Sequence, residues 1–335
     1  MQEKETSCSQ YDEVKAANLI KILKKKYPEF FEKYIIKEYM GNMGSRINSM
    51  EFKALSKKRN ITVTLIIKLK REEEEDEEIK ILKRLKNENI IQLYEICEID
   101  EKEEKKKLFF IVTECPKFGD LISFRNCFFR TEGLSEQFLC FISFQILNAL
   151  KYFQKCKIVH LDIKPQNIVI DDYLIIKITD FSLSFDYSKI KSNNIKLPFR
   201  GTCYYTAPEI IQRKEIQVNN LNKVDLYSLG VTLYHLAFHK YPYELNFDDS
   251  NNMEIIKEND NINRCYSPYF IDFITKLLER DINKRMDINE AMNHYWIKGA
   301  QILLDEKENT YDNDCFLRHL ITNYIMNFNR YLNKK

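Results

Sequence analysis

Two aspartates and an asparagine are the residues of this sequence best suited to proton transfer and metal binding. Asp162 and Asn167 lie in the strip His160-Leu161-Asp162-Ile163-Lys164-Pro165-Gln166-Asn167, and Asp180 follows eighteen positions beyond Asp162. A carboxylate can accept a proton, and carboxylate and amide oxygens are hard ligands that suit Mg²⁺. A single aspartate between strands is more often a turn residue, so these residue types alone do not decide the function.

The chain that positions these residues is long enough for two lobes. At 335 residues it exceeds the size at which a single hydrophobic core stops growing. Its 52 Lys and Arg residues oppose 50 Asp and Glu residues and leave a net charge of +2, so we expect no binding to nucleic acid or to a membrane. Nine cysteines without paired spacing and no N-terminal apolar segment predict an intracellular protein, cytoplasmic or nuclear, with reduced thiols.

The hydrophobic periodicity changes near Pro116. Before it, one or two short helices are expected at 11–32, strands at 34–39, 50–55, 61–69 and 108–113, and a charged helix at 74–85. After it, helices are expected at 136–156, 223–238, 267–279, 289–296 and 316–332, with a hairpin of 168–170 and 174–179 among them. The pattern predicts a small, mostly antiparallel sheet with one helix, followed by a helical region.

Several strings of the sequence occur in the order of a known family. The strip 160–167 resembles the catalytic loop of the eukaryotic-type serine/threonine protein kinases, and Asp180-Phe181-Ser182 resembles the metal-binding turn of that family. The string Gly201-Thr202-Cys203-Tyr204-Tyr205-Thr206-Ala207-Pro208-Glu209 is similar to the segment that closes the family's activation loop. The resemblance covers roughly residues 34–297.

Two more strings extend this resemblance toward the C-terminus. Residues 223–233 look like the central helix whose aspartate anchors the catalytic loop, and 281–285 resemble the segment whose arginine pairs with Glu209. A bidentate pair of Arg285 and Glu209 positions rather than reacts, so its expected role is structural. Matches in this order over about half of the chain make coincidence negligible.

The resemblance implies a reaction and its cofactors. The γ-phosphoryl group of ATP would pass to a Ser or Thr hydroxyl of a protein substrate, with Mg²⁺ as the second cofactor. Asp162 would orient the hydroxyl and take its proton, and Lys164 would steady the migrating phosphoryl group. Asn167 and Asp180 would supply oxygen ligands to Mg²⁺.

The nucleotide site that the resemblance implies draws on both parts of the sequence. Lys68, in Leu65-Ile66-Ile67-Lys68, would bind the phosphates, and Glu78 would pair with it from a helix that is shorter than usual, because only ten residues separate the two. The other expected nucleotide contacts are Gly41, Gly44, Glu114, Val169 and Asp180. For the segment with Gly41 and Gly44, an ordinary hairpin turn is the competing interpretation.

Four departures from the family pattern bear on control and on ATP affinity. Leu161 replaces the usual arginine beside the catalytic aspartate, and 197–200 has no hydroxyl at the expected activating position. We therefore expect activity that activation-loop phosphorylation does not switch. Pro116 has no N–H for the adenine, a loss of about 1 kcal/mol, and Ser182 replaces a glycine of the metal turn.

Two classes of function follow from these strings. The first is a serine/threonine protein kinase, and the alternative is a pseudokinase, a binding or scaffold module with weak or no catalysis. Retention of Lys68, Asp162, Asn167 and Asp180 favours the enzyme, because a scaffold does not need all four. A P-loop NTPase is disfavoured, because no G-x-x-x-x-G-K-[ST] string occurs.

The expected fold is α+β and bilobal. A small antiparallel β lobe with one helix would occupy residues 34–115, and a larger, mainly α-helical lobe would occupy 116–297. Helical extensions are expected at 1–33 and 298–335. The sequence gives no indication of the oligomeric state.

Overall fold

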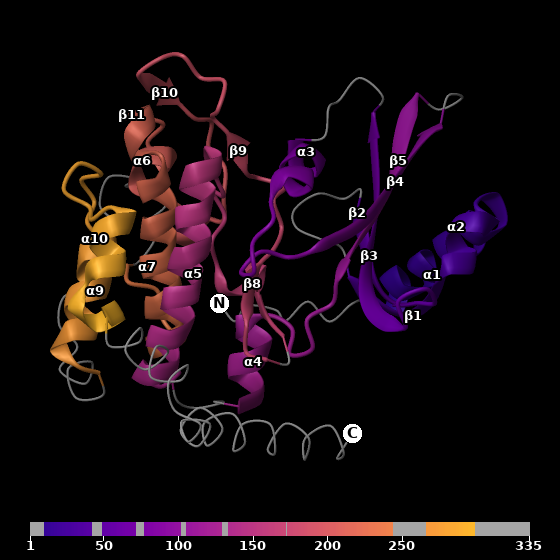
Figure 1. Ribbon diagram of the computed structural model, residues 1–335, viewed down its shortest axis with the longest axis horizontal. Coiled ribbons are helices and arrows are strands. Elements are labelled where there is room, and N and C mark those ends of the chain that lie inside the picture. The colour runs from indigo at the N-terminus through magenta and orange to yellow at the C-terminus, as the bar shows by residue number, and fades with distance from the viewer. Residues whose placement is uncertain are drawn as a thin grey trace. The chain divides into compact units, whose positions relative to one another are not determined.

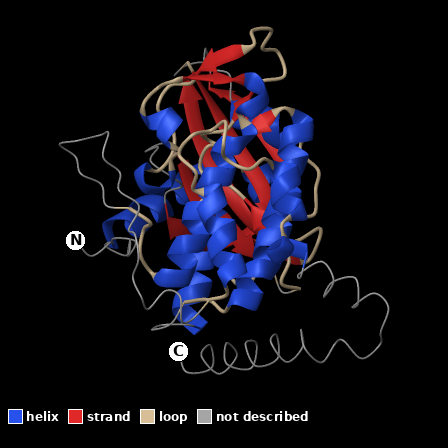
Figure 2. Cartoon of the chain, turned by 90° about the vertical axis from the view of Figure 1, so that its left-hand side faces the viewer, coloured by secondary structure: helices blue, strands red, loops and turns tan. Residues whose placement is uncertain are grey.

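In a computed structural model, the chain forms two compact units, shown as ribbons in Figures 1 and 2. The described residues are 10–41, 49–71, 77–101, 105–128, 133–171, 173–243 and 266–298. The first unit comprises the chain up to residue 86 together with 91–116, and the second comprises 87–90 and the chain from 117 onward.

A five-stranded antiparallel sheet forms the centre of the first unit. Its strands are β1 (Tyr34–Gly41), β2 (Ser49–Ser56), β3 (Ile61–Arg71), β4 (Leu93–Glu101) and β5 (Lys106–Glu114), in the order β1-β2-β3-β5-β4. The helix α3 (Glu77–Arg84) follows β3, and residues 74–76 of the expected helix lie outside the described residues. The small antiparallel lobe with one helix is thereby confirmed.

Both faces of this sheet are covered by helices. Figure 1 shows α3 on one side and the N-terminal helices α1 (Gln10–Lys26) and α2 (Pro28–Lys33) on the other. In β3, Leu65 packs in the cluster that includes the N-terminal helices, and its neighbour Ile66 packs against Ile79 of α3. Successive strand side chains point to opposite faces, so a strand covered on both faces has an unbroken apolar run.

Helices dominate the second unit. They are α4 (Leu121–Phe128), α5 (Glu136–Cys156), α6 (Pro208–Ile211), α7 (Asn222–Phe238), α9 (Pro268–Leu277) and α10 (Ile288–Asn293). Helix α5 begins after Ser135, whose hydroxyl accepts from the N–H of Phe138 at 3.4 Å. Helix α7 is buried along nearly its whole length, so its sequence is apolar on all sides rather than on one stripe.

Three short antiparallel strand pairs shape the loops between these helices. β6 (Ile158–Val159) pairs with β9 (Phe185–Asp186), β7 (Ile168–Ile170) pairs with β8 (Ile176–Ile178), and β10 (Asn194–Lys196) pairs with β11 (Glu215–Gln217). Short 3-10 helices lie at Pro165–Asn167, Cys203–Tyr205 and Val218–Asn220. The β7–β8 pair is the hairpin predicted after the strip 160–167.

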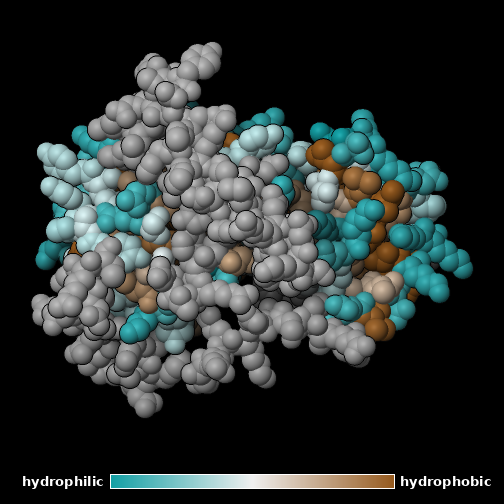
Figure 3. All heavy atoms as spheres, turned by 90° about the horizontal axis from the view of Figure 1, so that it is seen from below, coloured by the Kyte–Doolittle hydropathy of each residue, from teal (hydrophilic) through white to brown (hydrophobic). Residues whose placement is uncertain are grey.

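The two units match the predicted α+β, bilobal architecture. The expected helix at 316–332 lies outside the described residues. Among the helices that the structure describes, none combines the length and apolar character needed to cross a membrane. Figure 3 shows apolar and hydrophilic residues interspersed on the described surface of the first unit, on the right of that view.

Candidate active site

A buried carboxylate on α7 holds the start of the strip 160–167. The N–H of His160 donates to Oδ2 of Asp225 at 2.7 Å, and the N–H of Leu161 donates to Oδ1 at 2.8 Å. Burial raises the pKa of Asp225, and both N–H bonds oppose this rise. The His160 ring is fixed as well, with Nε2 lying 3.1 Å from the carbonyl oxygen of Thr179 and its centroid 5.0 Å from that of Phe181.

The carboxylate of Asp162 is surrounded by hydrogen-bond donors. Thr202 donates its N–H and its hydroxyl to Oδ1, at 3.0 and 2.7 Å. The side-chain amide of Asn167 donates to Oδ2 at 2.9 Å, and Nζ of Lys164 lies 2.7 Å from the same oxygen. Burial alone would raise the pKa of Asp162, but the ammonium of Lys164 and the Thr202 hydroxyl outweigh burial and hold that pKa below its usual range. Asp162 is therefore ionised at neutral pH.

Glycine at position 201 is a steric requirement of this arrangement. Gly201 has φ +114°, and a Cβ there would lie 2.7 Å from the carbonyl oxygen of Leu161 and 2.7 Å from Oγ1 of Thr206. Only a residue without a side chain lets the backbone pass this close to the strip. Because of this close approach, the next residue, Thr202, lies within hydrogen-bond distance of Asp162.

The β7–β8 hairpin places Asn167 next to Asp180. Ile168 pairs with Ile178, so the residues just outside this pair face each other, and the N–H of Thr179 donates to the carbonyl oxygen of Asn167 at 3.0 Å. Asp180 follows Thr179 with φ +61°, and its Oδ1 accepts from the N–H of Ser182 at 3.2 Å. The amide nitrogen of Asn167 is occupied by Asp162, so its amide oxygen is the atom placed to bind a cation.

In the first unit, Lys68 of β3 and Glu78 of α3 form an ion pair. Nζ of Lys68 donates to Oε2 of Glu78, and both side chains are buried, with 7% and 8% of their surfaces exposed. The pair forms although only ten residues separate the two in sequence, and Glu78 lies in the first turn of α3 as the structure describes it. The ion pair expected from the sequence is therefore present.

Comparison with known proteins gives a consistent family. Protein kinase domains match residues 34–297 of the chain. The Aurora kinase of Schizosaccharomyces pombe is 30% identical over 233 residues, which are 69% of this chain and 61% of that protein. Testis-specific serine/threonine-protein kinase 1 of Mus musculus is 31% identical over 229 residues, 66% of this chain and 58% of that protein. The chain belongs to the eukaryotic-type serine/threonine protein kinase family.

A plant kinase adds to these relatives. CBL-interacting serine/threonine-protein kinase 12 of Arabidopsis thaliana is 29% identical over 266 residues, 78% of this chain and 50% of that protein. The chain thus spans about half to three fifths of the length of these relatives. Protein kinases use ATP and a divalent metal ion on protein substrates. In this chain, the helices α1 and α2 precede the matched protein kinase domain and lie outside it.

The other residues expected to contact nucleotide in a kinase are distributed over both units. Gly41 ends β1 with φ +124°, and Gly44 lies outside the described residues. Glu114 ends β5, and its carbonyl oxygen accepts from the Thr113 hydroxyl at 3.2 Å. Val169 lies in β7 and is partly exposed. None of these four residues has a cationic side chain that could bind a phosphate.

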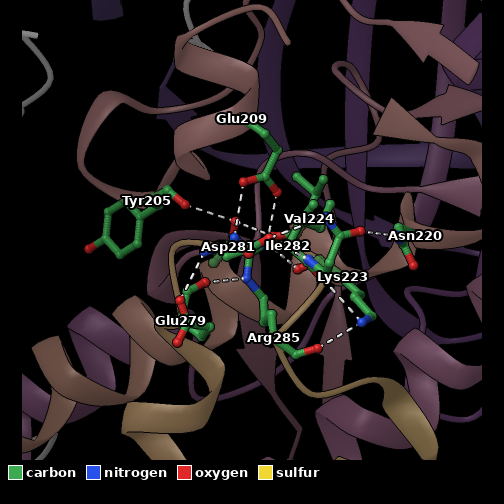
Figure 4. A network of polar contacts seen from close by, with 11 residues as sticks. Tyr205, Glu209, Asn220, Lys223, Val224, Glu279, Asp281, Ile282 and Arg285 are labelled. Atoms are coloured by element: carbon green, nitrogen blue, oxygen red, sulfur yellow. Dashed lines mark hydrogen bonds and ion pairs between the residues drawn. The ribbon is translucent and has the colours of Figure 1, made fainter. Parts of the chain in front are cut away.

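A second buried ion pair stabilises the segment after Thr202, as Figure 4 shows. Arg285 donates from two guanidinium nitrogens to the two carboxylate oxygens of Glu209, at 2.7 and 2.9 Å. Arg285 also donates to the carbonyl oxygens of Glu279 and Lys223, at 2.8 and 2.9 Å. Nζ of Lys223 in turn donates to the carbonyl oxygens of Ile282 and Arg285. The pair thus has the bidentate, positioning geometry that the sequence predicts.

Leu161, which replaces the arginine usual in the family, lies in an apolar cluster. It is 3% exposed and has φ +65°, a left-handed conformation that is rare for a residue of this size. The cluster includes Tyr187 and Leu197, which lie in the chain between Asp180 and Glu209. Leu161 therefore binds this segment through apolar packing, where an arginine would bind it through charge.

Sequence reasoning did not assign a role to Thr202. Thr202 lies forty positions after Asp162, and only the folded chain brings the two together. The available signal is the string Gly201-Thr202, which lies in the segment that resembles the end of the family's activation loop. Among the described residues, no group of three or more His, Cys, Asp or Glu side chains forms a metal centre.

Proposed function

We propose that this chain is an active protein kinase that transfers the γ-phosphoryl group of ATP to Ser or Thr hydroxyls of protein substrates, with Mg²⁺ as the metal. The observation that carries this proposal is the environment of Asp162. Its carboxylate is ionised and is aimed by Thr202, Asn167 and Lys164, which is what a base for a hydroxyl proton needs. A binding module has no use for such an aimed carboxylate.

Lys164 supports the same reaction. Its ammonium lies 2.7 Å from both Oδ2 of Asp162 and Oγ1 of Thr202, so positive charge stands beside the proposed base. Charge develops on the transferred phosphoryl group and on the hydroxyl that attacks it, and a fixed ammonium stabilises that charge. We assign Lys164 to this role, and we assign Lys68, held by Glu78, to the phosphates of bound ATP.

Asn167 and Asp180 fit a Mg²⁺ ion. The hairpin places Asn167, which has an amide oxygen, and Asp180, which has a carboxylate, just beyond its paired strands, and Mg²⁺ is commonly bound by one or two such oxygens together with substrate phosphates. When bound, the ion neutralises charge on the phosphates during transfer. The chain's own residues supply the rest: Asn167 orients Asp162 through its amide nitrogen while offering its oxygen to the metal.

A thermal-shift experiment separates the kinase from the pseudokinase. We expect ATP with Mg²⁺ to raise the melting temperature of the full chain, and ATP without Mg²⁺ to raise it less. Asp180→Asn should lose most of the Mg²⁺-dependent part, whereas Asp272→Asn, a change at an exposed carboxylate on α9, should keep it. Absence of any ATP-dependent shift in the wild-type chain would favour the scaffold.

The packing of Leu161 supports activity that does not depend on activation-loop phosphorylation. The segment between Asp180 and Glu209 is held by the apolar cluster around Leu161 and by the β10–β11 ladder, in which Ile195 pairs with Ile216. Neither contact uses a phosphate. Phosphatase treatment and the double variant Ser188→Ala with Ser192→Ala, which removes two hydroxyls of this segment, should leave the rate unchanged. A lower rate after either treatment would contradict this part of the proposal.

A further inference from the structure

The N-terminal helices close the face of the sheet that lies opposite α3. The ring of Phe30 in α2 stacks on Phe110 of β5, with centroids 4.3 Å apart and an interplanar angle of 17°. Phe31 and Tyr27 contact the same ring edge-on, at 5.6 and 5.8 Å. Phe110 is fully buried as a result. Three aromatic side chains that lie outside the matched kinase domain thus enclose a central side chain of the sheet.

Two carboxylates of β4 fasten these helices to the sheet. Oε1 of Glu95 accepts from Nζ of Lys33 at 2.8 Å, and Oε2 accepts from the hydroxyl of Tyr34 at 2.6 Å. Burial raises the pKa of Glu95, but the bonds from Lys33 and Tyr34 outweigh burial and bring that pKa below its usual value. Glu101, at the other end of β4, accepts from Lys26 and Tyr27. The contact is therefore fixed at both ends of one strand.

The covered face leads directly to Lys68. Phe110 lies opposite Ile67 in the β3–β5 ladder, and Ile67 belongs to the same buried cluster as Phe30. The next residue, Lys68, points to the other face of the sheet, where it meets Glu78 of α3. A change in the twist or position of β3 therefore moves the ammonium of Lys68 relative to that carboxylate.

We propose that α1 and α2 are positioning elements for nucleotide binding, because they hold β3 in the place that aims Lys68 at Glu78 and at the phosphates. This inference rests on the proposed function, in which Lys68 binds ATP. An antiparallel sheet with one bare face alternates polar and apolar residues, whereas β3 and β5 have unbroken apolar runs. The helices thus replace solvent over the apolar side chains that β3 and β5 place on this face, among them Leu65, Ile67 and Phe110.

The first test compares two buried phenylalanines. Phe30→Leu removes the stacked ring beside β5, and Phe273→Leu removes a ring of α9 that lies 4.9 Å from Trp296 in the second unit. With equal amounts of folded full-length protein, Phe30→Leu should raise KM for ATP by about five-fold or more, with kcat within about two-fold of wild type. Phe273→Leu should leave KM for ATP unchanged. A purely structural role would lower the folded fraction of both variants and change neither KM.

A second measurement does not need a bound nucleotide. The rate at which an acylating reagent labels Lys68, divided by the rate for the exposed Lys57, reports how well Lys68 is held. Phe30→Leu should raise this ratio several-fold and Phe273→Leu should not. If Phe30→Leu does not fold, the double variant Lys33→Ala with Tyr34→Phe, which removes both donors to Glu95, should raise the ratio in the same direction.

The two measurements separate the inference from the function on which it rests. A wild-type chain that neither binds nor uses ATP overturns the proposed function, and the labelling ratio still decides whether α2 holds Lys68. An unchanged ratio in folded Phe30→Leu and in the double variant overturns the positioning role. An equal rise in Phe273→Leu overturns it too, because the effect would then be one of general stability.

Discussion

Thr202 donates both its backbone N–H and its hydroxyl to Oδ1 of Asp162, at 3.0 and 2.7 Å. The same hydroxyl accepts from Nζ of Lys164 at 2.7 Å. One side chain therefore connects the proposed base, the neighbouring cation and the segment that follows Gly201. The aim of the Asp162 carboxylate depends on the placement of that segment as well as on the strip 160–167.

Removing the Thr202 hydroxyl should slow phosphoryl transfer. Thr202→Val keeps the branched shape and the backbone N–H but loses one hydrogen bond to a charged group, worth about 1.5–3 kcal/mol. If that stabilisation is needed in the transition state, kcat should fall by about ten- to a hundred-fold, since each 1.36 kcal/mol is a factor of ten. Thr202→Ser, which keeps the hydroxyl, is the matched control. Steady-state kinetics giving wild-type kcat for Thr202→Val would show that the contact is dispensable.

Neutralising Glu209 should destabilise the second unit strongly. Glu209→Gln keeps the shape but leaves Arg285 buried with its charge uncompensated, and losing one partner of a buried pair costs about 3–5 kcal/mol. The control is Lys276→Gln, which breaks an exposed pair with Asp272 on α9 and should cost about 0.3–0.5 kcal/mol. Thermal unfolding of both variants makes the comparison. Equal, small losses would mean that the Glu209–Arg285 pair does not hold the segment.

The stability of the chain should fall between pH 6.5 and pH 4 because of His235. Burial, reinforced by the nearby charge of Arg125, lowers the pKa of His235 from 6.5 to about 4. The unfolded chain takes up the proton near pH 6.5 and the folded chain only near pH 4, so the unfolded state binds more protons in this window. The contribution of His235 to stability is therefore fully present above the unfolded-state pKa of 6.5, and it is lost as the pH falls toward 4.

The variant His235→Gln isolates this histidine from the other titrating groups. Its side-chain oxygen can still accept from the Tyr205 hydroxyl, which lies 2.6 Å from Nδ1 of His235 in the wild type. We expect the melting temperature of the variant to vary less between pH 6.5 and pH 4.5 than that of the wild type. Parallel curves for the two proteins would assign the pH dependence to other groups.

The sequence predicts those parts of the arrangement near Asp162 that depend on residues close together in the chain. The hairpin that joins Asn167 to Asp180 has both strands and its turn within about a dozen residues, so periodicity and turn residues predict it. The resemblance of 223–233 and 281–285 to family segments likewise predicts that Asp225 anchors the strip 160–167 and that Arg285 pairs with Glu209. The contact of Thr202 with Asp162 could not be predicted in this way, because it depends on the close approach of the backbone at Gly201 to Leu161, which only the tertiary fold creates.

The place of the N-terminal helices could not be read from their own sequence. The apolar spacing of 11–32 predicts a helix with one buried stripe but does not say which surface covers that stripe. Glu95 and Glu101 lie in β4, a strand that the periodicity does not predict, and their partners lie sixty or more positions away in the sequence. The unbroken apolar runs of β3 and β5 were the available clue, since they require a cover on the second face.

The rate of phosphotransfer by Asp162→Asn tests the central claim most directly. The change removes the proposed base and its charge, while the exposed neighbour Gln166, changed to Ala, serves as the control in the same strip. With Mg²⁺ and ATP, we predict that Asp162→Asn loses about a hundred-fold or more of the wild-type rate, in line with general base catalysis, and that Gln166→Ala retains that rate. Phosphotransfer by Asp162→Asn at the wild-type rate would contradict the assignment of Asp162 as the base.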